Sequence, residues 1–344
     1  MKTALLNLAE SGRLPDALIR IGIRNLLKGR LRELNTSGKT TGDMINFLRD
    51  EPVAVDTSAA NEQHYEVPTR FFLKALGPRM KYSSCIWPDS ISTLAQAEDA
   101  MLDLTCQRAD LKDHMDILEL GCGWGSLTLW MAERFPNARI LAVSNSATQR
   151  AHIETQALDR GHCNVEVRTQ DMNDFDPGRK VDRIVSVEMF EHMRNPGKLL
   201  DRAADWLKPD GKIFIHIFTH AGKPYLFQDQ GREQDWMSRY FFTGGMMPSP
   251  DYLPNASEKL VLEDEWRING IHYTKTLEAW LKRQDNAKTD ILPLFEKTYG
   301  PENAAVWFQR WRMFWMACAE LFAFRNGEEW PVHHYRFKKK APSA

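Results

Sequence analysis

The sequence predicts an α/β fold in which a mostly parallel sheet carries helices on both faces. Strands and helices alternate over residues 116–218, a glycine-rich turn joins the first of these strands to the next helix, and the alternation stops after Thr219. Alternation at this spacing is typical of a doubly wound parallel sheet. A chain of 344 residues can bury a large core, as one domain or as a domain with a cap.

Residues 1–50 are expected to be helical and basic. Pro15 stands at the start of a helix that begins near Leu14, and an apolar stripe along it is formed by Leu18, Ile21, Leu26, Leu27, Leu31 and Leu34. A basic amphipathic helix either lies on a membrane surface or docks on protein. We expect docking, on the chain itself or in a homodimer, with peripheral membrane contact as the alternative. Residues 36–46 are expected to form a loop.

A polar and aromatic segment precedes the alternating region. It comprises residues 61–68, a helix over residues 69–76 and the stretch 81–87, and a further helix covers residues 94–108. This composition is unusual for a linker and suits a lid over a cofactor, with Tyr82 and Ser83 as contact candidates. We therefore assign residues 1–110 to an N-terminal helical arm and lid.

The glycine-rich turn is the strongest local motif. Residues 117–120 form a short apolar run that contains one acid, Glu119, and the chain then continues through Gly121, Gly123 and Gly125 into an apolar helical pattern. Glycines permit positive φ and close approach of a ligand to the backbone. A dinucleotide-binding G-x-G-x-x-G turn would need a third glycine at Leu127.

The spacing E-x-G-x-G-x-G therefore favours a turn that binds S-adenosylmethionine (SAM), whereas an ordinary strand–helix turn is the alternative. Glu119 would accept a hydrogen bond from SAM or balance its positive charges, because its apolar neighbours make a solvated acid a poor interpretation. Trp124 would cover the amino-acid end of the cofactor or pack the turn.

The strands that follow end in polar residues. We expect strands over residues 139–145, 164–170, 181–187 and 212–218, with helices over residues 147–160 and 198–207. Ligands bind at the carboxyl ends of such strands. The candidates for ribose are Asn145, Ser146 and Gln149, and those for adenine are Asp171, Met172 and Asn173. Residues 111–220 are thus assigned to the cofactor-binding core.

A second constellation follows the strand over residues 181–187. Glu188 and Glu191 are three residues apart and share one side of a helical turn, and His192 can take up a proton near neutral pH. Two carboxylates and an imidazole beside a methyl donor suit an amine acceptor. The alternative is a helix N-terminus at which acids offset the dipole. No histidine at i+4 supports a metal site, so none is expected.

The chain changes character after the core. Residues 221–300 are assigned to an inserted substrate cap. Residues 301–344 are assigned to a C-terminal helix over residues 304–324 and a last strand over residues 332–337. The helix is expected to be buried because it is apolar almost all round. The substrate-pocket candidates are Cys85, His216, Trp236, Tyr240, Phe241, Trp315 and Trp330.

Composition excludes several classes of protein. The net charge of −1 does not draw the surface toward nucleic acid. The five cysteines contain no C-x-x-C, so neither a zinc site nor a disulfide framework is indicated. No signal-peptide pattern and no run of about 18 apolar residues is present. We therefore expect a soluble, cytoplasmic protein.

Several motifs together reveal a family resemblance. The runs E-L-G-C-G-W-G-S-L and V-S-V-E-M-F-E-H-M, with L-P-D-A-L-I-R near residue 14, H-Y-E-V-P, K-Y-S-S-C and N-G-E-E-W, extend over nearly the entire chain. This chain closely resembles the cyclopropane-fatty-acid synthase-like group of SAM methyltransferases, and within it the coclaurine N-methyltransferase branch. The resemblance implies a Rossmann-like SAM methyltransferase fold, whose seven-stranded sheet is roofed by N-terminal and inserted helices.

The resemblance also implies roles for individual residues. Glu191 and His192 would form the proton-handling dyad of the N-methylating enzymes, with Glu188 close to the amine. In the lipid-modifying members a bicarbonate ion is held by cysteine, glutamate, histidine and tyrosine; Cys85, Glu191 and His216 match the first three. No tyrosine stands near residues 313–314, which argues against bicarbonate and against cyclopropane formation. Cys318 matches another family cysteine, to which we assign no chemistry.

The expected activity is therefore SAM-dependent N-methylation of an amine on a small aromatic or apolar molecule, with S-adenosylhomocysteine (SAH) as the second product. The alternative enzyme transfers a methyl or methylene group to the double bond of an unsaturated lipid acyl chain. A third interpretation, a protein that binds SAM without turnover, is disfavoured because a binding module has no need of the base in E-x-x-E-H.

Overall fold

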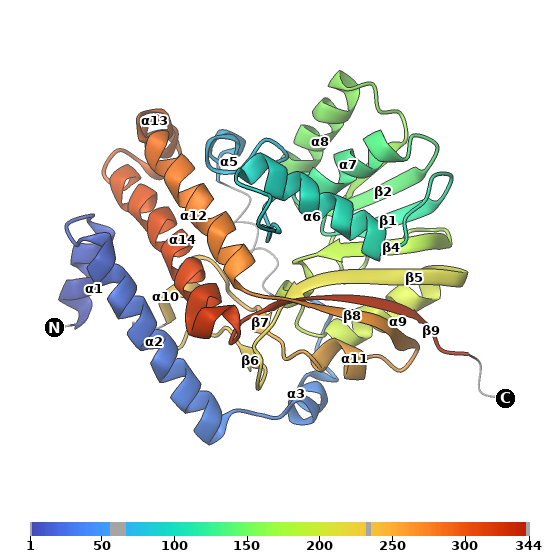
Figure 1. Ribbon diagram of the computed structural model, residues 1–344, viewed down its shortest axis with the longest axis horizontal. Coiled ribbons are helices and arrows are strands. Elements are labelled where there is room, and N and C mark those ends of the chain that lie inside the picture. Colours follow the sequence, from blue (N-terminus) through green and yellow to red (C-terminus); the bar gives the residue numbers. More distant parts are fainter. Residues whose placement is uncertain (1, 56–66, 232–234, 342–344) are drawn as a thin grey trace.

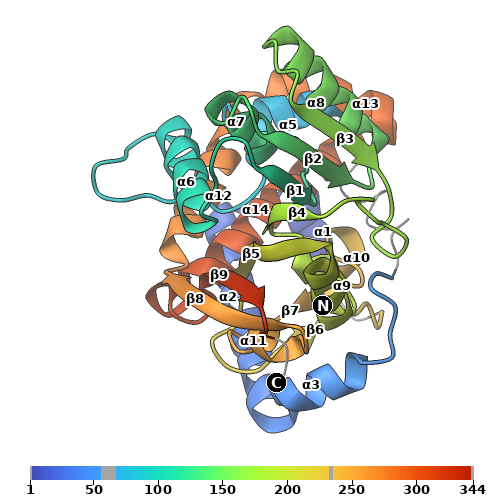
Figure 2. The ribbon, with the colours of Figure 1, turned by 90° about the vertical axis from the view of Figure 1, so that its right-hand side faces the viewer.

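The computed structural model describes residues 2–55, 67–231 and 235–341, and places one mixed sheet at the centre of the molecule. Its seven strands have the order β3-β2-β1-β4-β5-β9-β8, from β3 at the top of Figure 2 downward. Neighbours from β3 to β5 are parallel, and β9 and β8 are antiparallel additions. The strands are β1 (Asp116–Leu120), β2 (Arg139–Ser144), β3 (Val165–Thr169), β4 (Val181–Val187), β5 (Leu207–Phe218), β8 (Leu260–Ile268) and β9 (Val332–Lys339). The predicted mostly parallel, seven-stranded sheet is confirmed.

Helices cover both faces of this sheet, as the alternation predicts (Figure 1). On β1, Leu118 and Leu120 pack into one core cluster while Ile117 packs into another, because successive side chains of a strand point to opposite faces. The face of Ile117 is covered by α6 (Leu94–Arg108) and α7 (Ser126–Arg134), next to α8 (Ala147–Asp159). The opposite face is covered by α3 (Thr41–Leu48), α9 (Pro196–Trp206) and α11 (Tyr252–Ala256).

A helical layer stands beside the sheet and has a core of its own. It is built from α1 (Lys2–Glu10), α2 (Asp16–Ser37), α5 (Thr69–Ala75), α12 (Ile271–Asn286), α13 (Lys288–Tyr299) and α14 (Ala304–Gly327). Figure 1 shows α2, α12 and α14 side by side in this layer. Trp280, Trp311 and Trp315 are almost fully buried in its core. The expected burial of the helix over residues 304–324 is confirmed.

The short elements β6 (Tyr225–Leu226), α10 (Trp236–Tyr240) and β7 (Met246–Met247) follow β5, and β6 pairs with β7. The segment 221–300, which we expect to form an inserted substrate cap, also contains β8, which pairs with β9 in the main sheet. This segment is therefore joined to the main sheet by backbone hydrogen bonds. The sequence does not mark this strand, because three consecutive acids, residues 263–265, interrupt the apolar–polar alternation that is typical of a strand.

The expected loop over residues 36–46 is wrong at both ends: α2 extends to Ser37 and α3 begins at Thr41, so only residues 38–40 lie outside a helix. Thr40 caps α3: its side chain accepts a hydrogen bond from the Asp43 backbone N–H, and the Asp43 carboxylate accepts one from the Thr40 N–H. This reciprocal pair is a helix-start signal. The motif at residues 61–68 is outside the described residues except for its last two positions.

The N-terminal arm docks on its own chain, which is one of the two docking modes expected for the basic helix. Ile19, Leu31 and Leu34 of α2 are buried. Arg20 donates to Glu278 of α12 at 2.6 Å and to Glu320 of α14 at 3.1 Å. Among the described residues, none of the helices is long and apolar enough to cross a membrane.

Candidate functional site

A cavity of about 710 Å³ lies where the carboxyl ends of the parallel strands meet the helical layer. Such a volume is typical of small-molecule sites. The glycine turn and the tips of β2, β3 and β4 form one wall, and α2, α12 and α14 form the other. Apolar side chains dominate the helical wall, among them Leu26, Leu277, Trp280, Phe314, Trp315 and Phe322. The space therefore has a polar side made by the sheet and an aromatic side made by the helices.

The glycine turn has the backbone that its sequence predicts. Gly121 has φ +77°, and a Cβ there would lie 2.4 Å from Cγ of Met189. Gly125, with φ +79°, is the N-cap of α7, and a Cβ there would lie 2.5 Å from Cγ1 of Ile153. Gly121 and Gly123 line the cavity, whereas Gly125 is behind them. The turn brings backbone close to the cavity at the N-terminus of a helix, a position that favours polar ligands.

Glu119 forms part of the cavity wall below the turn. It is 3% exposed, and its Oε2 accepts a hydrogen bond of 2.5 Å from Oγ1 of Thr128. Burial raises the pKa of Glu119 to about 8, and the hydrogen bond opposes this. A positively charged ligand group in the cavity would favour the carboxylate. Glu119 is thus placed as the sequence predicts, facing the space next to Gly121.

Trp124, Tyr82 and Ser83 close the cavity beside the turn. Phe72 of α5 packs against both aromatic rings, with centroids 5.1 Å from Trp124 and 5.2 Å from Tyr82. The loop that carries Tyr82 is held by Glu98, whose carboxylate accepts hydrogen bonds from the backbone N–H groups of residues 79 and 81. The predicted lid residues therefore contact the predicted cofactor turn.

The tips of β2 and β3 supply further polar side chains. Asn145, Gln149, Asp171 and Met172 line the cavity. Ser146 does not: its Oγ accepts from the Gln149 backbone N–H and caps α8. Asn173 is also outside the lining, because its side chain pairs with the backbone of Ala54 in both directions, at 3.1 Å each. Ser146 and Asn173 thus position the loops that carry the lining residues.

Glu188 follows β4 with φ +49° and lines the cavity. Its Oε1 accepts from the Ser84 backbone N–H at 2.8 Å and lies 3.1 Å from Nε2 of His216, and its Oε2 accepts from the Tyr273 hydroxyl at 2.6 Å. The pKa of Glu188 is raised because burial outweighs the Lys81 charge and the hydrogen bonds from Tyr273 and Ser84, which lower it. These donors favour the ionised form.

Glu191 and His192 belong to the short helical turn η1 (Phe190–His192) and differ in position. His192 lines the cavity, with its ring centroid 4.5 Å from that of Phe242. Glu191 is fully buried outside the lining, and its Oε1 accepts from the Phe218 N–H at 2.8 Å. Its Oε2 has no hydrogen-bond partner among the described residues. Burial and the charge of Glu188 raise the pKa of Glu191 well above its usual range.

The substrate-pocket candidates divide into two groups. Trp236 and Trp315 line the cavity. The others lie outside its lining: Tyr240, Phe241 and Trp330 are part of the surrounding aromatic packing, and Cys85 and His216 are fully buried behind Glu188. An aromatic residue near a pocket and one in its supporting core have the same sequence signature, so composition could not separate them.

The three residues that match a bicarbonate site do not face the cavity together. Cys85 has a buried thiol whose pKa burial raises to about 12. His216 directs one ring nitrogen at Glu188 and the other at His334, 2.9 Å away. Glu191 is bound to the backbone of β5. All three side chains support the wall from behind.

Sequence reasoning missed several residues of the site. Tyr273 and Trp280 come from α12 and Lys81 from the lid loop, and all three line the cavity. Asn25 and Gly29 of α2 line it as well, so the arm helix is part of the wall. A tyrosine in the insert had no motif to mark it. Lys81 is 3% exposed, and nothing in the sequence distinguishes a buried lysine from a solvated one at the start of the stretch 81–87.

The geometry can be compared with known proteins. The family model described as mycolic acid cyclopropane synthetase matches residues 54–330. An (S)-coclaurine N-methyltransferase from Thalictrum flavum subsp. glaucum is 35% identical over 345 residues, covering 98% of this chain and 95% of that protein. The cyclopropane-fatty-acyl-phospholipid synthase of Escherichia coli (strain K12) is 31% identical over 276 residues, covering 79% of this chain and 66% of that protein.

The fold also matches that of a solved structure. The crystal structure of coclaurine N-methyltransferase bound to N-methylheliamine and SAH matches with a TM-score of 0.93 at 33% identity. The match covers 98% of this chain and 99% of that chain. The likeness therefore includes the arm, the sheet and the helical layer.

Proposed function

The chain belongs to the mycolic acid cyclopropane synthetase family, and from that membership we propose that it is a SAM-dependent methyltransferase that N-methylates an amine on a small aromatic or apolar molecule. Relatives named as N-methyltransferases support the reaction type. The cyclopropane-forming alternative is less favoured, because the named relative of that kind matches less of the chain.

One observation carries the proposal: a single cavity joins the glycine turn to Glu188, His192 and an aromatic wall. The donor would occupy the side made by Glu119, Gly121, Gly123, Asn145 and Asp171. The acceptor would occupy the side lined by Trp280 and Trp315. A cavity of about 710 Å³ is large enough for both molecules to meet inside it.

We assign distinct roles to the polar groups beside the acceptor. SAM supplies an electrophilic methyl group on a sulfonium. Glu188 holds the amine through its N–H, and His192 takes the proton that the nitrogen must lose. Glu191 ties the turn that carries His192 to β5 through the Phe218 N–H. Alignment of donor and acceptor in a closed space provides most of the acceleration.

The test is incubation with methyl-labelled SAM and separate panels of secondary aromatic amines and unsaturated phospholipid vesicles. We expect the label on an amine nitrogen, identified by mass spectrometry of the product. Label found only in acyl chains would establish the lipid alternative. SAM binding without transfer to either panel would contradict the proposal.

A further inference from the structure

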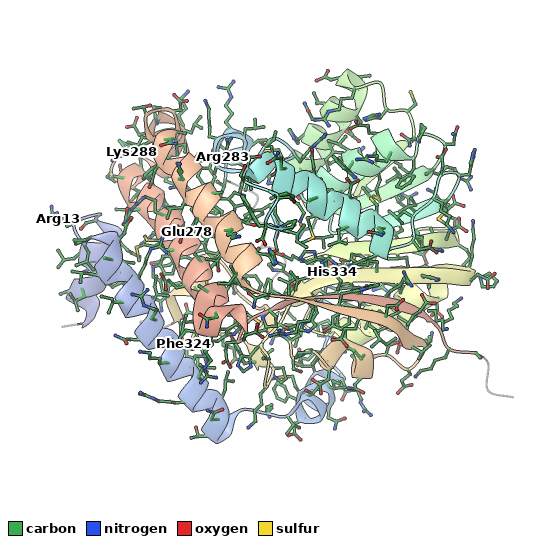
Figure 3. All side chains as sticks on the ribbon, in the orientation of Figure 1. Arg13, Glu278, Arg283, Lys288, Phe324 and His334 are labelled. Carbon is green, nitrogen blue, oxygen red and sulfur yellow. The ribbon has the colours of Figure 1, made fainter. Side chains whose placement is uncertain are left out.

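Four side chains form a continuous hydrogen-bonded chain from the molecular surface to the cavity. Arg108 Nη1 lies 2.9 Å from Nδ1 of His334, His334 Nε2 lies 2.9 Å from Nδ1 of His216, and His216 Nε2 lies 3.1 Å from Oε1 of Glu188. Both histidines are 0% exposed. Figure 3 labels His334 near the middle of the molecule.

The sheet itself sets this alignment. His216 and His334 are register partners on the antiparallel strands β5 and β9, and the Glu188 backbone N–H donates to the carbonyl of His216 at 2.8 Å. Opposed side chains of neighbouring strands point to the same face. On that face Arg108, the last residue of α6, lies over the ring of Trp266 at 4.9 Å. The chain thus runs laterally across β4, β5 and β9.

The arginine gives the chain one direction. A guanidinium has only donors, and although burial lowers the pKa of Arg108 to about 10, it remains charged at neutral pH. Nδ1 of His334 must therefore accept, which leaves the proton on Nε2 to be donated to Nδ1 of His216. By the same reasoning His216 carries its proton on Nε2 and donates it to Glu188. Burial and the nearby cations lower the pKa of both histidines, so they are neutral.

The opposite direction of donation, from Glu188 toward Arg108, is excluded by the contact between His334 and Arg108. If Glu188 were protonated on Oε1 and donated to His216, each imidazole would turn its Nδ1–H outward. His334 would then direct an N–H at the N–H groups of Arg108 across 2.9 Å. Two donors at that distance repel each other, and both N–H groups would be left without an acceptor inside the protein.

We propose that Arg108 and His334 are positioning residues, which act through His216 to hold Glu188 as a hydrogen-bond-accepting carboxylate at the acceptor side of the cavity. A carboxylate has about four lone-pair positions. Ser84 and His216 take two on Oε1 and Tyr273 takes one on Oε2. The position that remains on Oε2 is available to an N–H of the acceptor.

The identity of the acceptor in this proposal rests on the proposed function, whereas the order of the hydrogen bonds rests on the structure alone. A fixed carboxylate with one open lone pair selects a cationic or N–H-bearing acceptor, because an uncharged olefin offers it no donor. The substrate class is therefore an amine that keeps a hydrogen on nitrogen when it binds. The chain has no route outward for a proton, since Arg108 cannot accept one, so proton removal remains with His192.

Tautomers can be measured without turnover. In protein labelled with ¹⁵N-histidine, long-range ¹H–¹⁵N correlations distinguish the two neutral tautomers, and His216→Gln and His334→Gln assign the signals. We expect both histidines as neutral Nε2–H tautomers at pH 7, and loss of the single tautomer at His334 in Arg108→Met. An Nδ1–H tautomer or an imidazolium at either position in the wild-type protein would overturn the proposal.

Kinetics test the consequence for the acceptor. Glutamine at position 334 can accept from Arg108 and donate to His216, whereas leucine can do neither. We expect His334→Leu and Arg108→Met to lower kcat/KM for the amine at least tenfold, His334→Gln to restore most of it, and SAH affinity to stay within twofold in all three. The matched control is His333→Leu: His333 is on the same strand, but its ring is hydrogen-bonded to the Thr219 hydroxyl and not to Arg108 or His216.

Three other outcomes of these experiments would each decide against a part of the account. If leucine and glutamine at position 334 behave alike, the order of donors has no role and the proposal fails. If SAH affinity falls together with turnover, the residues are structural and it fails as well. If no variant and no wild-type protein methylates an amine, the proposed function has failed, and the tautomer measurement alone decides whether the chain is directional.

Discussion

Glu188 and Glu191 show how position decides charge at the scale of the residue. They are three residues apart after β4, but Glu191 is fully buried, whereas Glu188 faces the cavity with its side chain 7% exposed. Glu188 accepts hydrogen bonds from Ser84 and Tyr273, whereas one oxygen of Glu191 has no partner among the described residues. Two neighbouring carboxylates rarely ionise together. We therefore assign the negative charge to Glu188 and a proton to Glu191.

His192 provides the first test at this scale. Replacement by alanine removes the proposed proton acceptor but leaves the glycine turn intact, so turnover should fall about 100-fold or more while SAH affinity is unchanged. Steady-state kinetics and calorimetry measure the two quantities. The control is His114→Ala, whose side chain is 78% exposed. Retention of wild-type turnover in the His192 variant would remove this residue from the mechanism.

Glu119 provides a second test, through pH. Burial raises the pKa of Glu119 to about 8 in the unliganded protein, so below pH 8 the carboxyl is mostly protonated. A cationic donor favours the carboxylate and must displace that proton. SAM affinity should then increase by up to about tenfold per pH unit as the pH rises toward 8.

Calorimetric titrations at pH 6.5, 7.5 and 8.5 compare the wild type with Glu119→Gln, because their ratio cancels the titration of SAM itself. The ratio should grow with pH. Glu133→Gln, on the exposed side of α7, is the control. Parallel pH dependences of wild type and Glu119→Gln would show that this acid does not meet the donor's charge.

At the scale of the element, the turn between β1 and α7 depends on two different properties of glycine. Gly125 needs both a positive φ, +79°, and the space beside Ile153. Gly123 has φ +52°, but a Cβ added there would meet nothing within 4 Å. Backbone strain alone costs about 1–2 kcal/mol, and overpacking adds about 1–3 kcal/mol. The two positions therefore separate strain from steric conflict.

We expect Gly125→Ala to lower the free energy of unfolding by about 3 kcal/mol and Gly123→Ala by about 1 kcal/mol. Urea denaturation of both variants measures this difference. Equal losses would mean that Ile153 yields to the new methyl group and that its packing does not define the turn.

The sequence predicted the elements of the sheet more completely than the composition of the site. Strand tips and the glycine turn are local features, so Glu119, Asn145, Asp171 and Glu188 could be placed from spacing alone. Tyr273, 85 residues from Glu188, could not be placed because only the packing of α12 brings it there. His334 and His216, 118 residues apart, meet only through the antiparallel pairing of β5 and β9.

At the scale of the whole molecule, the arm closes the cavity from the side opposite the sheet. Residues of α2 line the space, and ion pairs hold the helix against α12 and α14. Arg312 of α14 bridges the two other helices, because it donates to Asp16 of α2 and to Asp285 of α12, and its own side chain is 16% exposed. Arm position and acceptor binding should therefore be coupled.

Arg312→Met tests this coupling. Because both carboxylate partners are about 40% exposed, solvent screens the pairs, and the loss of stability should be about 1–2 kcal/mol. The KM for the amine should rise while SAH affinity changes little. Arg150→Met, which breaks an exposed pair with Glu154, is the control and should cost no more than about 0.5 kcal/mol. An unchanged KM despite reduced stability would separate the arm from the acceptor site.

The most direct measurement is a crystal structure of the protein with SAH and a methylated amine. SAH should lie along Glu119, Gly121 and Asp171, with its sulfur directed at the amine nitrogen and that nitrogen within hydrogen-bonding distance of Glu188 or His192. SAH bound outside this cavity, or an amine whose nitrogen is turned away from both residues, would contradict the account.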